Sequence, residues 1–591
     1  MIKTLVKAVR DAKLPAILTP IFVLLESLIE VSIPSVMAKL IDEGITPTEA
    51  MPNGDMNAVV KYGIILAILT LIALFFGTAA GYTASRASSR FARNLRQDMY
   101  YNIQNYSFSN IDKFSPASLV TRLTTDVQRV QMAFQMITRI TFRAPAMLIF
   151  AFVFSYRTSA KLSTIFLCVI PFLAIVLAII VKTAFPVFSK TFKAYDNLNE
   201  VVEENVRGIR VVKSFVREEH EKSKFDKASD TIFRLFTKAE KTVAFNAPAM
   251  QISVYFCIIM ISWFGAHEIV AHGNVEDLGL TTGGLQSLFT YTMQILMSLM
   301  MLSMIFVMLT MSKASADRVC EVLNERSDIV DGERNLTEIK DGSVEFKNVS
   351  FKYYATSEKS ALNNIDLKIN SGETIGIIGG TGSSKSTLVQ MIPRLYDVTD
   401  GEVLVGGENV RDYNLEALRS GVAMVLQKNV LFSGTISENI RWGDENATDE
   451  EVHHVCELAC ADEFIQGFPE KYNTYIEQGG SNVSGGQKQR LCIARALLKK
   501  PKILILDDST SAVDTATDAK IRKAFREEIP NTTKIIIAQR VSSICDADKI
   551  IILDEGHIVG MGTHDELYAS SDIYREIYDS QTKGADNDGT E

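Results

Sequence analysis

The sequence predicts a multidomain protein: an all-α domain of six transmembrane helices with long cytoplasmic helical extensions, followed by an α/β domain. Up to about Met311 the chain contains repeated apolar runs of the length that crosses a hydrocarbon layer of ~30 Å. After Asn335 short Val/Ile strands alternate with charged helices. A chain of 591 residues also exceeds a single hydrophobic core. We expect a transmembrane domain at residues 1–325, a linker at 326–340, the α/β domain at 341–580 and a polar tail at 581–591.

The membrane half contains six expected spans separated by two long polar segments. The spans are Pro15–Leu40, Tyr62–Tyr82, Ile137–Tyr156, Ser163–Phe185, Phe245–Val270 and Leu285–Met311. The segments between the second and third spans and between the fourth and fifth have helical periodicity but are too polar for lipid. We therefore expect them to form helices that project into the cytoplasm. Lys and Arg recur at helical spacing before the first span, which favours a cytoplasmic surface helix, at Lys3, Lys7, Arg10 and Lys13.

Charge predicts the orientation of these spans in a cell membrane. Arginine and lysine crowd the two long segments, at Arg86, Arg90, Arg93, Arg96, Arg122 and Arg129 in the first and Lys190, Lys193, Arg207, Arg210, Lys213 and Arg217 in the second. The connections Glu43–Asn57 and His272–Gly284 contain neither residue type. Because Lys and Arg prefer the cytoplasmic side, both termini are expected in the cytoplasm.

Composition excludes some other classes of function. The net charge is -9 and there is no basic stripe interleaved with aromatic residues, so nucleic acid is not an expected partner. The seven cysteines fall in segments expected to lie inside the cell or the membrane, which argues against a disulfide framework. Membrane lipid, nucleotide and another subunit are the expected partners.

Two features of the spans are candidates for substrate contact. Glu26 and Glu30 lie one turn apart in the first span and could contact a cation, or could pack near headgroups or bond to a neighbouring span. The sixth span has methionines at steps of three or four, at Met293, Met297, Met300, Met304 and Met308. Flexible thioethers suit a promiscuous apolar surface, which makes Met297, Met300 and Met304 candidates, although ordinary helix packing gives the same spacing.

The α/β half contains a phosphate-binding pattern. A buried strand at Glu373–Gly379 leads into a loop and then an apolar helix that begins near Leu388. Backbone N–H groups of such a loop, together with the helix N-terminus, surround phosphates. The expected ATP-binding residues here are Gly379, Gly380, Thr381, Gly382, Ser383, Ser384, Lys385, Ser386 and Thr387. Lys385 would neutralise the terminal phosphates, and the Ser386 hydroxyl could ligate Mg²⁺.

A second buried strand supplies a carboxylate for the same metal. Ile503–Leu506 is followed by Asp507, which is placed to hold the Mg²⁺ hydration shell. About 20 residues earlier lies Ser484-Gly485-Gly486-Gln487, here called the signature. The order of loop, signature and acidic strand is far more specific than any of the three alone.

With these motifs the chain resembles ATP-binding cassette (ABC) exporters of the multidrug type over nearly its whole length. The resemblance implies that Tyr353 stacks on adenine and that Gln427 links Mg²⁺ to the membrane domain. It implies further that the loop Ser511–Asp514, including Asp514, contacts an opposite subunit. Phe114–Val130 and Asn205–Lys213 are similar to the segments that couple the two domains in this family, although solvated helices would explain them as well.

Three positions depart from the family pattern. Ser384 replaces the last glycine of the loop, Asp508 replaces the glutamate that polarises the attacking water, and Gln539 replaces a histidine. Aspartate is one methylene shorter than glutamate, and loss of a well-placed general base typically lowers the rate by roughly 10²-fold to 10⁴-fold. Glutamine can donate a hydrogen bond but has no imidazole charge or proton. The alternative is that Asp508 and Gln539 function adequately as conservative replacements.

In this family each ATP lies between the phosphate loop of one subunit and the signature of the other. The intact signature would therefore complete the partner's site, whereas this chain's own site is impaired. The resulting hypothesis is the degenerate-site subunit of a heterodimeric, ATP-hydrolysing exporter of amphipathic or drug-like compounds in a bacterial plasma membrane. A homodimeric lipid or peptide exporter and an ATP-binding regulatory subunit that moves no substrate are the alternatives.

Overall fold

The chain forms two compact units in a computed structural model, which describes all residues except 47–53, 273–279, 355–356, 358, 509–512 and 588–591. The first unit comprises Met1–Gln104 and Ser115–Glu325, and the second comprises Asn105–Phe114 and Arg326–Glu591. The short segment 105–114 therefore packs with the α/β unit, although the residues before and after it in sequence belong to the first unit.

The first unit is entirely helical among its described residues. Its α-helices are α1 (Ile2–Lys7), α2 (Lys13–Lys39), α3 (Met56–Gln104), α5 (Pro116–Thr121), α6 (Val127–Thr158), α7 (Ala160–Arg207), α8 (Ile209–Ser214), α9 (Glu218–Ala244), α10 (Asn246–His272) and α11 (Thr282–Asn324). A 3₁₀ turn at Arg10–Ala12 precedes α2, and π-helical turns at Leu40–Ile45 and Arg122–Asp126 follow α2 and precede α6. Within the part of the chain that the structure describes, six helical stretches are long and apolar enough to cross a membrane, which confirms the six predicted spans.

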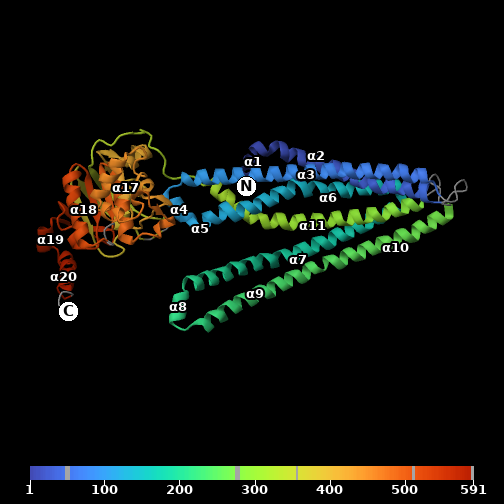
Figure 1. Ribbon diagram of the computed structural model, residues 1–591. Coiled ribbons are helices and arrows are strands. Elements are labelled where there is room, and N and C mark those ends of the chain that lie inside the picture. Colours follow the sequence, from blue (N-terminus) through green and yellow to red (C-terminus); the bar gives the residue numbers. More distant parts are fainter. Residues whose placement is uncertain (47–53, 273–279, 355–356, 358, 509–512, 588–591) are drawn as a thin grey trace. The chain divides into compact units, whose positions relative to one another are not determined.

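The predicted helical extensions are also present. The helices α3 and α7 contain 49 and 48 residues, so at 1.5 Å per residue each is about 70 Å long, more than twice the thickness of a bilayer core. Figure 1 shows α7 and α9 side by side as an antiparallel pair joined by the short α8. Buried residues from several helices form the core of the unit, including Phe166 and Leu173 of α7 and Leu288 and Tyr291 of α11.

The second unit contains an antiparallel sheet of order β2-β1-β4-β5 and a six-stranded sheet of order β12-β11-β3-β10-β9-β6. The strands are β1 (Val344–Phe351), β2 (Leu362–Ile369), β3 (Thr374–Ile378), β4 (Asp400–Val405), β5 (Glu408–Asn409), β6 (Val422–Val425), β9 (Ile503–Asp507), β10 (Thr533–Ile537), β11 (Lys549–Asp554) and β12 (His557–Gly562), with β7 (Gly434–Thr435) and β8 (Tyr475–Ile476) forming a separate pair. The helices are α4 (Phe108–Phe114), α12 (Lys385–Gln390), α13 (Leu415–Gly421), α14 (Ile436–Ile440), α15 (Asp449–Leu458), α16 (Asp462–Gln466), α17 (Gly485–Leu498), α18 (Thr515–Glu528), α19 (His564–Ser570) and α20 (Asp572–Asn587).

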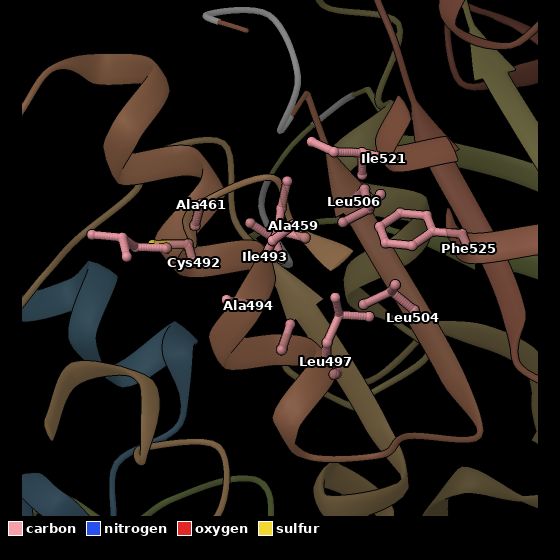
Figure 2. Packing of buried hydrophobic residues seen from close by; sticks show 14 of the residues in the cluster. Ala459, Ala461, Cys492, Ile493, Ala494, Leu497, Leu504, Leu506, Ile521 and Phe525 are labelled. Atoms are coloured by element: carbon pink, nitrogen blue, oxygen red, sulfur yellow. The ribbon is translucent and has the colours of Figure 1, made fainter. Parts of the chain in front are cut away.

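The larger sheet is parallel through β6, β9, β10, β3 and β11, and only β12 is antiparallel to its neighbour. Such strands are covered on both faces, which explains their nearly continuous Val, Ile and Leu sequences. Leu504 and Leu506 of β9 pack with Ile493 of α17 and Phe525 of α18 (Figure 2). The alternate residues of β9 pack into a second core on the other face. This double burial fixes the carboxyl end of β9, where Asp507 lies.

Candidate functional site

The phosphate loop, residues 379–387, joins β3 to α12 in a strained conformation. A Cβ atom on Gly379 would lie 2.0 Å from the carbonyl oxygen of Leu553, so a side chain is excluded there. Gly382 and Ser384 both have left-handed backbones, with φ of +83° and +71°. Glycine adopts this conformation freely, whereas an L-residue pays about 1 kcal/mol. Serine in place of glycine at 384 therefore has a backbone cost.

The Lys385 side chain bonds back to the earlier residues of this loop. Its ammonium group donates to the carbonyl oxygens of Gly379 (2.9 Å) and Gly380 (2.8 Å) and to the Ser383 hydroxyl (3.3 Å). Burial lowers the pKa of Lys385, while the nearby Asp507 and Asp508 carboxylates oppose that shift. A cation held at the mouth of a loop of backbone N–H groups is suited to bind the terminal phosphates of a nucleotide.

The two residues predicted to hold Mg²⁺ from separate motifs are in contact. The Ser386 hydroxyl donates to Oδ1 of Asp507 at 2.9 Å. Burial, with a smaller contribution from the Asp508 charge, raises the pKa of Asp507. A hydroxyl and a carboxylate are the hard oxygen donors that Mg²⁺ prefers, and a buried carboxylate gains from a neighbouring cation. The donor set therefore fits Mg²⁺.

Asp508 accepts hydrogen bonds from two amide side chains. Its Oδ2 atom accepts from Nε2 of Gln539 at 2.7 Å and more weakly from Nε2 of Gln427 at 3.5 Å. Its carbonyl oxygen lies 3.5 Å from Nε2 of Gln489, a contact that the sequence did not predict. The backbone is left-handed (φ +49°), a region that aspartate tolerates better than most residues. Burial raises the pKa of Asp508, and the two glutamine amides oppose the shift.

The predicted adenine-stacking residue contacts the last residue of the loop. The Tyr353 hydroxyl is 2.8 Å from the Thr387 hydroxyl, and its ring packs edge-on against Phe351 and Tyr396. Tyr396 in turn donates from its hydroxyl to Asp112 of α4 at 2.7 Å. An aromatic cluster thus joins the nucleotide site to α4, which sequence reasoning missed because the partners are distant along the chain.

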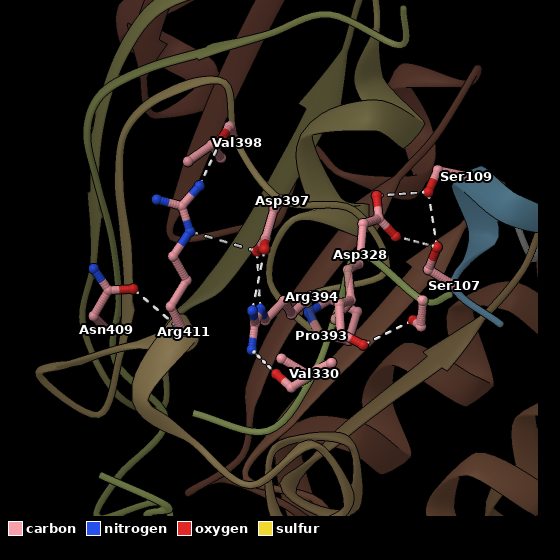
Figure 3. Close-up of polar contacts among 12 residues, drawn as sticks. Ser107, Ser109, Asp328, Val330, Pro393, Arg394, Asp397, Val398, Asn409 and Arg411 are labelled. Carbon is pink, nitrogen blue, oxygen red and sulfur yellow. Dashed lines mark hydrogen bonds and ion pairs between the residues drawn. The ribbon is translucent and has the colours of Figure 1, made fainter. Parts of the chain in front are cut away.

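The start of α4 is held by the segment that follows the membrane unit (Figure 3). Both Ser107 and Ser109 donate to the carboxylate of Asp328, at 2.5 and 2.8 Å. The buried guanidinium of Arg394 donates to the carbonyl oxygen of Val330 and to Asp397, which fixes that segment on the α/β unit. Segments 105–114 and 326–332 therefore dock together on one surface of this unit.

The signature forms the N-terminus of α17 as a capping box. The Ser484 hydroxyl accepts from the N–H of Gln487, and the Gln487 side chain accepts from the N–H of Ser484. Sequence reasoning missed this arrangement, although the Ser-x-x-Gln spacing was a usable signal for it. Ser484 and Gly485 are exposed, and no hydrogen bond among the described residues joins the signature to the phosphate loop. Asp514 caps α18 by accepting from the N–H of Thr517, whereas Ser511 and Ala512 lie outside the described residues.

The candidate substrate residues lie in the first unit. Arg143 of α6 donates to Glu26 at 2.5 Å and to Glu30 at 2.6 Å, so both carboxylates bond to a neighbouring span. This arginine was missed, although its position inside the third predicted span was a usable signal. Met297, Met300 and Met304 are 46%, 42% and 64% exposed. Their stripe therefore faces away from the core of this single chain.

The predicted coupling segments are found at helix junctions. The first includes α5, the π-helical turn and the start of α6, where buried Asp126 accepts two hydrogen bonds from the guanidinium of Arg318 in α11. The second covers the end of α7 and most of α8, where Ile209 and Val211 are exposed.

Comparison with known proteins identifies the family. Residues 16–300 match the ABC transporter transmembrane region and residues 362–511 match the ABC transporter family. The chain is 36% identical to the ABC transporter ATP-binding protein YfiB of Bacillus subtilis over 95% of each chain. It is 31% identical to the ATP-dependent lipid A-core flippase of Desulfotalea psychrophila over 87% of this chain and 89% of that protein.

The fold agrees with a solved exporter. A bacterial Atm1-family ABC exporter with ATP bound superimposes with a TM-score of 0.82 at 23% identity, covering 97% of this chain and 99% of that one. Together with the assembled loop, metal donors and signature, these matches establish that the chain belongs to the ABC transporter family, as an ATP-hydrolysing half-transporter with the fold of an ABC exporter.

Proposed function

We propose that this chain is the degenerate-site subunit of a heterodimeric exporter. ATP bound at its own phosphate loop turns over slowly, and its signature completes the hydrolytic site of an unlike partner subunit. The transporter moves amphipathic or drug-like compounds outward across a bacterial plasma membrane, with both termini of the chain in the cytoplasm.

The arrangement around Asp508 is the observation that supports the slow site. A general base must reach the attacking water, and its geometry matters to within about 0.5 to 1 Å. The Asp508 carboxylate lies on a side chain one methylene shorter than glutamate, and Oδ2 accepts from two glutamine amides. Gln539 is then committed to Asp508 and has no protonatable ring. Both departures weaken the same step, while Lys385, Ser386 and Asp507 retain what ATP and Mg²⁺ binding requires.

The geometry of the signature supports ATP hydrolysis at the partner's site. Its capping box leaves the exposed first turn of the 14-residue α17 with free N–H groups and the positive end of the helix dipole. Phosphate of a nucleotide held by a partner's loop is the natural ligand of such a turn. Asp514, at the start of α18, would contact the same partner.

Substrate contacts are proposed on two surfaces of the membrane unit. The exposed stripe of Met297, Met300 and Met304 offers a deformable apolar surface. The cluster of Glu26, Glu30 and Arg143 has a net formal charge of -1, and charged groups within a membrane normally face a polar cavity instead of lipid. A membrane unit that carries both an apolar surface and a polar, anionic cluster suits an amphipathic compound.

A homodimeric lipid exporter is the second candidate. The similarity to a protein named as a lipid A-core flippase favours it, since that relative is 31% identical along most of both chains. In that case the two sites would be identical and both would use Asp508.

Co-purification from the native membrane tests the heterodimer. We expect a second six-span chain with complete Lys, Glu and His residues at its ATP site to accompany this one. Substantial ATP turnover and substrate transport by this chain alone in liposomes would contradict the proposal. Failure of the complete complex to move a dye across the membrane would instead favour a regulatory subunit.

A further inference from the structure

The C-terminal helix α20 is anchored firmly to the α/β unit. Tyr574 is fully buried, and its hydroxyl lies 2.7 Å from Nδ1 of His564 at the start of α19. Arg575 donates to the carbonyl oxygens of Tyr568 and Ala569 at the end of α19. Tyr578, one turn further along α20, packs edge-on against Tyr568. These contacts fix the direction of α20 and therefore the place of the residues that follow.

One of those residues, Gln581, reaches the segment that contains Gln539. Its Nε2 donates to the carbonyl oxygen of Gln539 at 2.8 Å, and its Oε1 accepts from the N–H of Val541 at 2.8 Å. A single amide thus binds both sides of the peptide segment 539–541. The Gln539 side chain leaves the same segment in the direction of Asp508, to which it donates at 2.7 Å.

We propose that Gln581 is a positioning residue for Gln539, so that the C-terminal helix sets the geometry of the nucleotide site. The backbone at residue 539 determines where its Nε2 points, and two hydrogen bonds from a fixed helix restrict rotation of that backbone. Without them, Gln539 samples orientations that do not reach Asp508 or the terminal phosphate. This inference rests on the proposed role of Gln539 in the function above.

The contact also provides a route for regulation. Gln581 lies in the second half of α20 and is exposed, so detachment of the turn that carries it would release the segment 539–541 without unfolding the core. A contact with few buried apolar groups belongs to the part of a structure that opens at low free-energy cost. The rate at the site would then depend on whether this turn is docked.

The first test measures the contact directly. In the nucleotide-free, full-length transporter, Gln581→Ala should raise the hydrogen-exchange rate of the Val541 amide at least about 10-fold, because the side-chain acceptor of that N–H group is removed. Ser580→Ala is the matched control, since the Ser580 hydroxyl bonds within its own helix to the carbonyl oxygen of Ile577. An unchanged exchange rate at Val541 would overturn the proposed contact between Gln581 and the segment 539–541, whatever rate of ATP hydrolysis the variant shows.

The second test links the contact to catalysis. Single-turnover ATP hydrolysis is followed in the phase that Lys385→Ala removes, which reports this chain's own site. We expect Gln581→Ala to slow that phase about 3-fold to 10-fold with little change in the KM for ATP. In a Gln539→Ala background the same substitution should have no further effect, because the side chain that Gln581 positions is absent. Additive losses would overturn the positioning role.

The two tests separate the possible failures. If exchange at Val541 rises but neither Gln581→Ala nor Gln539→Ala changes the rate of ATP hydrolysis, Gln581 does hold the segment 539–541 and the proposed role of Gln539 is wrong. If Gln539→Ala slows hydrolysis and Gln581→Ala does not, the role of Gln539 holds and the positioning inference fails.

Discussion

At the scale of residues, the proposed slow site departs from the family pattern at Asp508 and Gln539. Restoring both groups should restore hydrolysis: we expect Asp508→Glu with Gln539→His to raise ATP turnover of the complex at least about 10-fold at this site. Glutamate extends the carboxylate by one methylene, and histidine supplies a group that can hold a proton near pH 7. Steady-state phosphate release measures the effect.

The single replacements are the controls for that experiment. Asp508→Glu alone should give part of the gain, because Gln539 can still donate a hydrogen bond to the carboxylate. Equal turnover in the wild-type, single and double variants would mean that Asp508 and Gln539 already function as adequate replacements.

Ser384 makes a separate, structural prediction. Its left-handed backbone (φ +71°) costs an L-residue about 1 kcal/mol that glycine does not lose. Ser384→Gly should therefore stabilise the nucleotide-free protein by up to about 1 kcal/mol and raise its thermal unfolding temperature. The control is Ser384→Ala, which removes the hydroxyl but keeps the Cβ atom and so should give no gain. A gain from alanine would assign the effect to the hydroxyl instead of the backbone.

At the scale of elements, sequence periodicity predicts helices, strands and the loops between them, but it does not predict side-chain contacts between distant parts of the chain. The six apolar runs predicted the spans because burial in lipid requires length and composition alone. The strand, loop and helix order predicted the phosphate loop, and separate motifs assigned Ser386 and Asp507 to the same Mg²⁺. The contacts of Tyr396 and Gln581 were not predictable, since each joins residues at least 40 positions apart that have no shared pattern. Arg143 was missed although its position inside the third predicted span was a usable signal.

The attachment of α4 makes a prediction at this scale. Tyr396→Phe removes the hydroxyl that donates to Asp112 and keeps the ring contacts with Tyr353 and Phe108. We expect a loss of about 1 kcal/mol in stability, because the bond is to a carboxylate but is partly exposed. Asp112→Asn should cost a similar amount, and the double variant little more than either. Thermal unfolding of the four proteins measures the coupling, and strictly additive losses would show that the two groups act independently.

Burial and the hydrogen bond to Asp112 also raise the pKa of Tyr396. The hydroxyl therefore stays protonated and remains a donor throughout the pH range in which an ABC transporter is assayed. The contact between α4 and the aromatic cluster should accordingly show no pH dependence of its own between about pH 6 and 9.

At the scale of the whole molecule, the chain carries both a phosphate loop and a signature, and in the proposed assembly these elements serve two different ATP molecules. The first unit has exposed apolar helix surfaces, and the second has an exposed helix N-terminus at Ser484 and Gly485. A second subunit would cover both kinds of surface. The identity of that subunit determines whether the two ATP sites are alike.

Substitutions at Lys385 and Ser484 distinguish the two assemblies. In a heterodimer, Lys385→Ala disables only the slow site and should leave most of the ATP turnover, whereas Ser484→Arg places a long cation in the partner's site and should reduce turnover at least about 100-fold. In a homodimer each substitution damages both sites, so both should be equally severe. Ser484→Ala is the control for the capping box, since it loses about 1 kcal/mol of helix stability without adding bulk. Purified complexes assayed with saturating Mg²⁺ and ATP give the comparison, and turnover that survives Ser484→Arg would refute the shared site.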